Sequence, residues 1–206
     1  MKVYETNDIR NVALIGHGHS GKTALTAGLL YTSGATNRLT RVDEGNTITD
    51  FDDDEIARKI TISSAVAATE WNKSKINLID TPGFNIFIND AKAALAAADA
   101  GMVIVDGVGG VEVQTEKVWS FCEEFKLPRA LVINKLDRER SSFDRTLENV
   151  QSVFGRTAVP IHLPIGSERE FSGVVDLVRM KAYAYTADGD GKGKESEIPA
   201  GLADAA

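Results

Sequence analysis

The sequence of 206 residues has a single cysteine, Cys122, and no long apolar segment. One cysteine excludes an intramolecular disulfide framework and any zinc site built from several cysteines. No apolar run approaches the roughly 18 residues that a transmembrane helix requires, and the polar start of the chain lacks a signal-peptide core. We therefore expect a protein of the reducing cytoplasm with no membrane partner.

Basic residues are also in the minority, with 23 Lys and Arg against 30 Asp and Glu and a formal net charge of −7. This balance argues against autonomous DNA binding by simple electrostatic attraction, although a shape-specific contact with a nucleoprotein particle remains compatible with it. Hydrophobic residues make up 43% of the chain and charged residues 26%, which excludes disorder of the whole chain. The length suits one domain, or one domain with part of another, and we expect a monomer.

Apolar runs and helical periodicities alternate along the first 157 residues. The runs are too short for helices, whereas the segments between them repeat their apolar residues at helical spacing. Strands are predicted at residues 11–15, 61–71, 75–79, 102–105 and 130–133, and helices at residues 23–32, after Gly83, and at 114–125 and 143–154. This alternation predicts an α/β fold, with a mostly parallel central sheet and helices on both faces.

Two parts of the chain do not fit this alternation. Residues 35–60 are polar, and we expect a long loop with at most short helical pieces, in which the acidic run at 50–55 is a solvated face. After residue 157, short strands are predicted at 159–165, 171–178 and 181–185, followed by a solvated loop at 188–197. We assign residues 1–157 to a domain core and residues 158–206 to the start of an inserted α+β subdomain.

A glycine-rich loop follows the first predicted strand and opens the first predicted helix. It matches G-x-x-x-x-G-K-[ST], a pattern in which backbone N–H groups and a helix N-terminus surround nucleotide phosphates. Lys22 is predicted to reach the β- and γ-phosphates and Thr23 to ligate Mg²⁺. We expect His17 and His19 to point into neighbouring loops; the alternative is that one of them contacts the γ-phosphate or the attacking water. The predicted phosphate-binding residues are Gly16, His17, Gly18, His19, Ser20, Gly21, Lys22 and Thr23.

Two further segments complete the predicted phosphate site. Asp80 ends a predicted strand and suits a water-mediated Mg²⁺ contact, and the backbone N–H of Gly83 suits the γ-phosphate. Thr61 follows the polar loop and is placed to close over the Mg²⁺ and the γ-phosphate. A threonine at this position is explained equally well as a β-branched residue that begins a strand. The candidate catalytic residues are therefore Lys22, Thr61 and Gly83, and the candidate metal ligands are Thr23, Thr61 and Asp80.

Residues 134–137, Asn-Lys-Leu-Asp, follow the predicted strand at 130–133. The Asp137 carboxylate can accept two hydrogen bonds from N1–H and the 2-amino group of guanine, a pair of donors that adenine lacks. The stem of Lys135 can lie against the base, and Asn134 can tie this segment to the phosphate loop. The alternative is that Asp137 caps a helix. Three motifs in this order, each after a strand, favour a GTPase of the P-loop NTPase fold.

From residue 11 to about residue 182 the sequence resembles the G domain of translation elongation factor G. The specific matches beyond the shared GTPase motifs are residues 58–62, 110–119, 127–129, 134–138, 163–166 and 171–177. The resemblance implies GTP, GDP and Mg²⁺ as cofactors and the ribosome as partner. It also implies GTP hydrolysis on the ribosome, driving translocation or a related step.

Three features depart from that family's pattern. Phe84 stands where the family commonly has a histidine that positions the attacking water, and His19 stands where it usually has an aspartate that holds a cation. The sequence also ends before the family's Ser-Ala guanine-contacting loop. We expect slow intrinsic hydrolysis, because water orientation is a large term in phosphoryl transfer. We interpret the chain as the N-terminal part of a longer, divergent elongation factor G-like protein, ending within an inserted subdomain.

Three functions are compatible with these motifs. The first is a translational GTPase stimulated by the ribosome. The second is a GTP-dependent switch that hydrolyses GTP weakly and acts through binding of partners. The third is a P-loop ATPase or small-molecule kinase, against which residues 134–137 argue.

Overall fold

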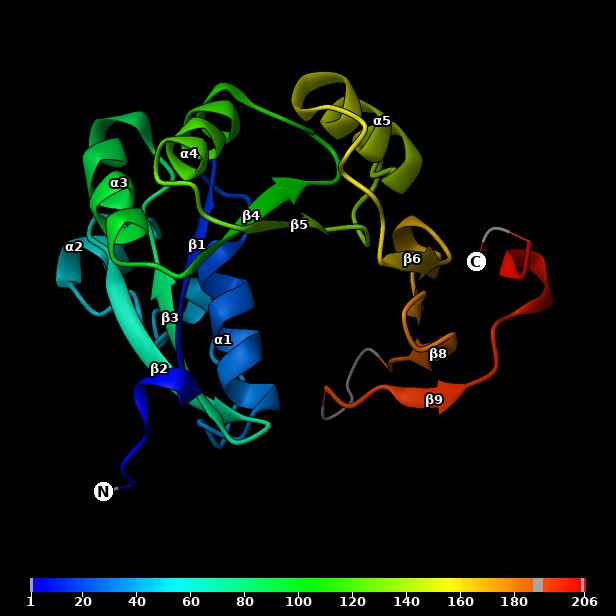
Figure 1. Cartoon of the computed structure of the whole chain (residues 1–206), viewed down its shortest axis with the longest axis horizontal. Helices are drawn as coiled ribbons and strands as arrows, with labels where there is room; N and C mark the ends of the chain where they lie inside the picture. Colours follow the sequence, from blue (N-terminus) through cyan, green and yellow to red (C-terminus); the bar gives the residue numbers. More distant parts are fainter. Residues whose placement is uncertain (1, 187–190, 205) are drawn as a thin grey trace. The chain divides into compact units, whose positions relative to one another are not determined.

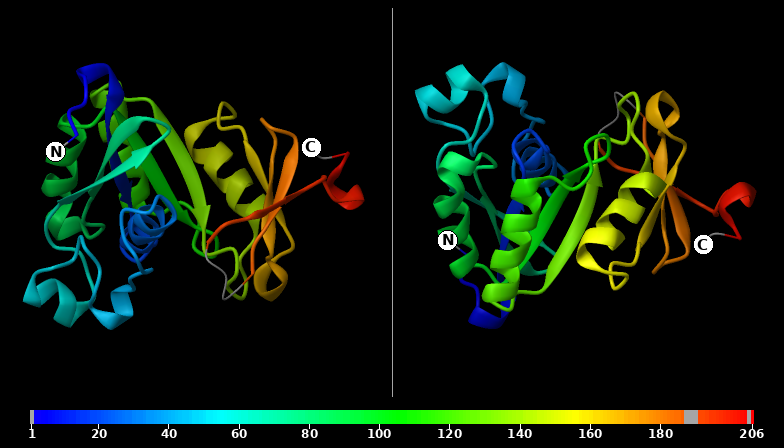
Figure 2. Two further views of the ribbon diagram at one scale, coloured as in Figure 1. Left: turned by 90° about the horizontal axis from the view of Figure 1, so that it is seen from below. Right: turned by 90° about the horizontal axis from the view of Figure 1, so that it is seen from above.

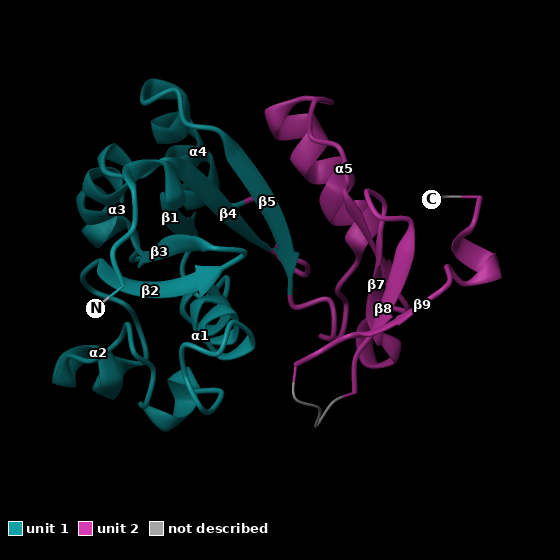
Figure 3. Cartoon of the chain, turned by 60° about the horizontal axis from the view of Figure 1, so that its bottom comes forward, with its two compact units in different colours: residues 1–105, 112–134 teal, residues 106–111, 135–206 magenta. Residues whose placement is uncertain are grey.

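The computed structural model describes residues 2–186, 191–204 and 206. It divides into two compact units (Figure 3). Unit 1 comprises residues 1–105 and 112–134, and unit 2 comprises residues 106–111 and 135–206. We describe each unit by itself. The predicted subdomain limit at residues 157–158 stays a prediction.

A five-stranded sheet forms the centre of unit 1 (Figure 1). Its strands lie in the order β2-β3-β1-β4-β5, in which β1 runs parallel to both β3 and β4 while β2 pairs antiparallel with β3. Asn72 and Lys73 have positive φ angles of 48° and 69° and form the tight turn of the β2–β3 hairpin. The strands are β1 (Ile9–Gly16), β2 (Ala65–Trp71), β3 (Ser74–Asp80), β4 (Ala100–Asp106) and β5 (Arg129–Asn134).

Helices cover both faces of this sheet, as the sequence predicted. Figure 2 shows α1 on one face and α3 and α4 on the other. The α-helices of unit 1 are α1 (Lys22–Thr32), α2 (Asp53–Arg58), α3 (Ile88–Ala96) and α4 (Val113–Glu124), and its 3₁₀ turns are Thr6–Asp8, Val42–Glu44 and Asn85–Phe87. The predicted α/β fold, with a mostly parallel central sheet and helices on both faces, is thereby confirmed. Among the described residues, no helix has both the length and the apolar character needed to cross a membrane.

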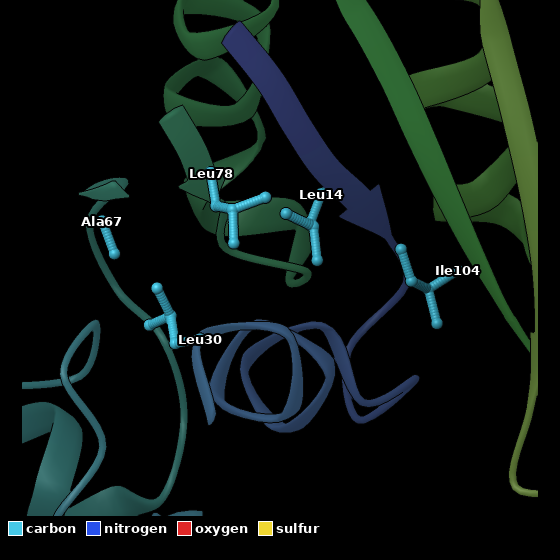
Figure 4. Close-up of a cluster of buried hydrophobic side chains, with 5 residues drawn as sticks. All are labelled: Leu14, Leu30, Ala67, Leu78 and Ile104. Carbon is cyan, nitrogen blue, oxygen red and sulfur yellow. The ribbon is translucent and has the colours of Figure 1, made fainter. Parts of the chain in front are cut away.

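The hydrophobic core of unit 1 packs around the end of β1. Leu14 of β1 is fully buried and clusters with side chains from α1, β2, β3 and β4 (Figure 4). The cluster comprises Leu14, Leu30, Ala67, Leu78 and Ile104. The phosphate loop begins two residues after Leu14, so its first glycine, Gly16, lies against Ile104 of this cluster.

Unit 2 contains helix α5 (Phe143–Phe154) and a four-stranded antiparallel sheet. The strand order is β6-β7-β8-β9. These strands are β6 (His162–Ile165), β7 (Gly173–Asp176), β8 (Lys181–Ala184) and β9 (Lys194–Ser196), with 3₁₀ turns at Glu168–Glu170 and Ala200–Leu202. The antiparallel sheet agrees with the short strands and the start of a subdomain that the sequence predicted after residue 157.

Strand β9 corrects one prediction, because it lies within the residues 188–197 that we expected to be a solvated loop. All three residues of β9 are exposed, and they are held by backbone pairing of Ala182 with Ser196 and of Ala184 with Lys194. Backbone pairing at a sheet edge needs no apolar side chain, so hydrophobicity gives no signal for such a strand. Residues 188–190 of the expected loop lie outside the described residues.

Candidate functional site

The phosphate loop joins the buried end of β1 to the start of α1. Gly16 has φ of 147°, and a Cβ atom there would lie 2.4 Å from the Ile104 carbonyl oxygen of the neighbouring strand. Gly21 has φ of 98° and is the N-cap of α1. Both positions therefore require glycine. The buried Lys22 ammonium returns across the loop and donates to the carbonyl oxygens of His17 at 2.8 Å and Gly16 at 3.3 Å.

The hydroxyl groups of Thr23 and Thr61 meet beside this loop, with their oxygens 3.0 Å apart. Thr61 donates to Asp50 Oδ1 at 2.9 Å, so the proton between the two threonines comes from Thr23. All three side chains are buried. Thr61 thus lies in the segment before β2, which begins only at Ala65. The expected strand start at residue 61 is wrong, because Thr61 bonds to Thr23 and Asp50, and the N–H groups of the next two residues bond to Glu55 instead of a strand.

Asp80 ends β3 and is fully buried. Its Oδ2 accepts a hydrogen bond from the Thr49 hydroxyl at 2.8 Å, while its Oδ1 has no hydrogen-bond partner. Burial raises the pKa of Asp80 to about 6, against the lowering effects of Thr49, Thr23 and the Lys22 charge. A buried carboxylate oxygen without a partner is costly unless a cation or donor approaches it.

These groups fit a magnesium ion. Mg²⁺ prefers hard oxygen ligands and completes its octahedron with water and substrate phosphates. Thr23 and Thr61 supply hydroxyl oxygens, and Asp80 supplies the unsatisfied oxygen. In the part of the chain that the structure describes, no three His, Cys, Asp or Glu side chains form a metal cluster. A cation here would therefore depend on the phosphates of a bound nucleotide.

Glu55 organises the polar loop, and sequence reasoning missed it. It is buried, and its Oε1 accepts from the backbone N–H groups of Ile62 at 2.9 Å and Ser63 at 3.1 Å. Its Oε2 accepts from Asp52 N at 3.3 Å, as part of the capping box that begins α2. Glu55 therefore fixes the segment that carries Thr61.

The interpretation of residues 50–55 as a solvated face is consequently wrong for Asp50 and Glu55, which are buried. It holds for the residues between them, Phe51 to Asp54, which are exposed. The sequence did contain one signal, because Asp52 followed three residues later by Glu55 is the spacing of a capping box. Burial of Asp50 raises its pKa, against the lowering effect of the Thr61 hydrogen bond.

Gly83 lies directly against the phosphate loop. A Cβ atom at this position would lie 2.4 Å from Lys22 Nζ, 2.6 Å from the His17 carbonyl oxygen and 2.7 Å from Gly18 N. Only a residue without a side chain allows the segment after β3 and the loop to approach so closely. The structure thus brings together Lys22, Thr23, Thr61, Asp80 and Gly83, all within unit 1.

The side chains of His17 and His19 contact neighbouring segments. His17 is buried, with Nδ1 3.3 Å from the Thr115 hydroxyl and Nε2 3.0 Å from Glu112 Oε1. This agrees with the expectation that it points into a neighbouring segment, here the start of α4. The His19 ring lies edge-on to the Phe84 ring, with centroids 5.2 Å apart. The buried Ser20 hydroxyl has no hydrogen-bond partner.

The segment at residues 134–137 begins where β5 ends. Asn134 Nδ2 donates to the Ser20 carbonyl oxygen at 2.9 Å, so the expected tie between this segment and the phosphate loop is present. Asp137 caps no helix, because α5 begins at Phe143 with Ser142 as its N-cap. The helix-cap alternative is therefore wrong.

Lys135 and Asp137 belong to unit 2. Lys135 has φ of 61° and its ammonium pairs with Asp106 Oδ2 at 2.7 Å. Partial burial alone would raise the pKa of Asp106, but Lys135 and the N–H groups of Val108 and Gly109 outweigh it and lower the pKa.

Comparisons with known proteins agree with this geometry. Residues 7–199 match the family model described as the elongation factor Tu GTP binding domain. The chain belongs to this family. Over 199 residues it is 40% identical to elongation factor G of Granulibacter bethesdensis, which corresponds to 96% of this chain and 29% of that protein.

A solved structure from Thermus thermophilus is also similar in fold. It superposes with a TM-score of 0.89 at 38% sequence identity and covers 96% of this chain and 29% of the other. The chain thus spans under a third of the length of the proteins that it matches. The residues that match the GTP-binding domain family include the phosphate loop and the five-stranded sheet that carries it.

Proposed function

We propose that the chain is the GTP-binding part of a translational GTPase of the elongation factor G type. In this proposal it binds GTP and GDP with Mg²⁺, acts on the ribosome in the cytoplasm and hydrolyses GTP to drive translocation or a related step. The observation that carries the proposal is the buried group around the phosphate loop, with the Lys22 ammonium, the paired Thr23 and Thr61 hydroxyls and the unsatisfied Asp80 oxygen.

Each residue then has one task. The Lys22 ammonium binds the β- and γ-phosphate oxygens, and the backbone N–H of Gly83 donates to the γ-phosphate. Thr23, Thr61 and Asp80 hold Mg²⁺, which neutralises charge on the phosphate oxygens when bound. Asp137 accepts from guanine, which selects GTP over ATP, and Asn134 keeps that segment tied to Ser20.

Nucleotide binding is tested with two variants. Lys22→Ala should lose tight binding of a fluorescent GTP analogue, as measured by equilibrium titration. Asp137→Asn should weaken GTP binding and improve binding of the xanthosine nucleotide, because an amide side chain offers a donor to the xanthine 2-oxo group. Unchanged GTP affinity in Asp137→Asn would refute the assignment of the guanine-reading residue.

A second candidate function is a GTP-dependent switch with weak hydrolysis that acts through partner binding. It is favoured by Phe84, which follows Gly83 directly and carries no hydrogen-bonding group to orient water. The two candidates differ in the rate of GTP hydrolysis with and without ribosomes. Strong stimulation by ribosomes supports the translational GTPase, and no stimulation supports the switch.

A further inference from the structure

The centre of the phosphate loop is in contact with an aromatic ring. A Cβ atom built on Gly18 would lie 3.0, 3.1 and 3.2 Å from Cζ, Cε1 and Cε2 of Phe84, and these are the three nearest heavy atoms. Normal carbon–carbon contacts are about 3.5–4.0 Å. Any side chain at residue 18 would therefore push the Phe84 ring away.

The backbone at Gly18 gives no other reason for glycine. Its φ angle is not among the positive ones, so an L-amino acid fits the backbone at this position. Gly16 and Gly83 differ, because a Cβ atom there would collide with backbone atoms. Glycine at residue 18 thus leaves the space that the Phe84 ring occupies.

Phe84 has a defined place beside the phosphate-binding lysine. The residue before it, Gly83, lies so close to Lys22 that a Cβ atom would be 2.4 Å from Nζ. The His19 ring packs edge-on against the Phe84 ring at an interplanar angle of 87°, an arrangement that aromatic pairs prefer. The ring is thereby held from two positions of the phosphate loop, Gly18 and His19.

We propose that Gly18 and Phe84 act as one unit, in which the ring covers the phosphate loop and keeps water from the terminal phosphate of bound GTP. This inference rests on the proposed function, since it concerns GTP bound at Lys22. An apolar ring neither orients nor activates water, and its coverage excludes water from the site. Phe84 thus has two effects on hydrolysis. It lacks a group that would orient water, and its ring also excludes water, which prolongs the GTP-bound state.

The test is a double-mutant cycle on single-turnover GTP hydrolysis by the complete chain without ribosomes. Phe84→Ala removes the ring and Gly18→Ala displaces it, so each should raise the rate about fivefold through renewed access of water. The double variant should show the same rise and no more, because both changes remove one contact. Phe84→Leu retains an apolar cover and should stay within about twofold of the unmodified chain.

Gly28→Ala is the matched control. Gly28 lies within α1, and a Cβ atom there meets nothing within 4 Å. This variant should hydrolyse GTP at the unmodified rate. Affinity for a fluorescent GTP analogue and the thermal unfolding midpoint are measured for every variant, so that a change in the hydrolysis rate is separated from a change in binding or folding.

The outcomes separate this inference from the proposed function. Loss of GTP binding by the unmodified chain would refute the proposed function. Tight GTP binding with rates that do not rise in Phe84→Ala would overturn the water-shielding role alone. Rates that rise in both single variants and multiply in the double variant would show that Gly18 and Phe84 act separately. If Gly18→Ala fails to fold, the comparison of Phe84→Ala with Phe84→Leu still decides whether the ring shields the site.

Discussion

Replacing Asp80 by asparagine should stabilise the nucleotide-free protein while it abolishes magnesium-dependent nucleotide binding. Asp80 is fully buried, one of its oxygens has no partner, and its pKa is raised from 3.8 to about 6. The ionised carboxylate is thus a group that the folded protein tolerates at a cost. An asparagine side chain at this position would keep an oxygen for the Thr49 hydroxyl and carry no charge.

The magnitude follows from the pKa. A shift from 3.8 to about 6 corresponds to a cost of about 3 kcal/mol for the ionised folded state, at about 1.4 kcal/mol per pKa unit. The asparagine amide replaces the oxygen without a partner and is itself left unsatisfied, which costs about 1–3 kcal/mol. We therefore expect Asp80→Asn to raise the free energy of unfolding by about 1 kcal/mol at pH 7.

The sign of the pH dependence provides the sharper test. Because the folded pKa of Asp80 lies above its unfolded value, the folded state binds the proton more tightly. The cost of Asp80 is complete above about pH 6, shrinks as the pH falls and is gone near pH 4. The stability advantage of Asp80→Asn over the unmodified chain should therefore be greatest at neutral pH and disappear in acid.

The assay is urea unfolding from about pH 4 to pH 8 in the presence of a chelator and without nucleotide. Asp106→Asn is the matched control, because the pKa of Asp106 is lowered by Lys135 and two backbone N–H groups despite its partial burial. A lowered folded pKa stabilises above the unfolded pKa, and this stabilisation is lost as the pH falls. Asp106→Asn should thus be less stable than the unmodified chain at neutral pH. A loss of stability at pH 7 in Asp80→Asn would refute the reasoning about Asp80.

Three further substitutions test other contacts. Glu55→Gln should lower the free energy of unfolding by about 1–3 kcal/mol, because it weakens charge-assisted hydrogen bonds from Ile62 and Ser63. In limited proteolysis, this variant should be cut faster within residues 35–64 than the unmodified chain. Gly83→Ala should reduce affinity for a fluorescent GTP analogue at least about tenfold, since its Cβ would lie only 2.4 Å from Lys22 Nζ. Unchanged affinity would contradict the close approach. Leu14→Ala should cost about 2–5 kcal/mol in chemical unfolding, because Leu14 is fully buried in the core cluster.

The phosphate loop could be predicted from the sequence because its signals are local. An apolar run, two glycines that need special φ angles and a helix start follow one another within residues 9–32. Each signal depends on the backbone of its own segment, so it can be recognised from the local sequence alone. The strands β4 and β5 were predictable for a similar reason, since a continuous apolar run fits a strand covered on both faces.

The burial of Asp50 and Glu55 was not predictable from composition, because it depends on contacts with residues outside the acidic run. Asp50 is buried against Thr61, and Glu55 accepts from residues seven and eight positions later. An acidic run on its own is typical of a solvated face. The contact of Gly18 with Phe84 joins residues 66 positions apart. Glycines are expected in a phosphate loop, so the glycine at residue 18 gave no sign of a distant partner.

The hydrogen-bonded series Thr23–Thr61–Asp50 indicates how the polar loop responds to ligand. Thr61 donates its proton to Asp50 and accepts one from Thr23, so one lone pair of its oxygen remains. Thr23 uses only its proton in this series and keeps its lone pairs available for a cation. Each of the two hydroxyl oxygens thus keeps a lone pair for a cation while these hydrogen bonds stay in place. The same two hydrogen bonds hold the polar loop against the phosphate loop, so Mg²⁺ ligation by Thr23 and Thr61 requires neither of them to break.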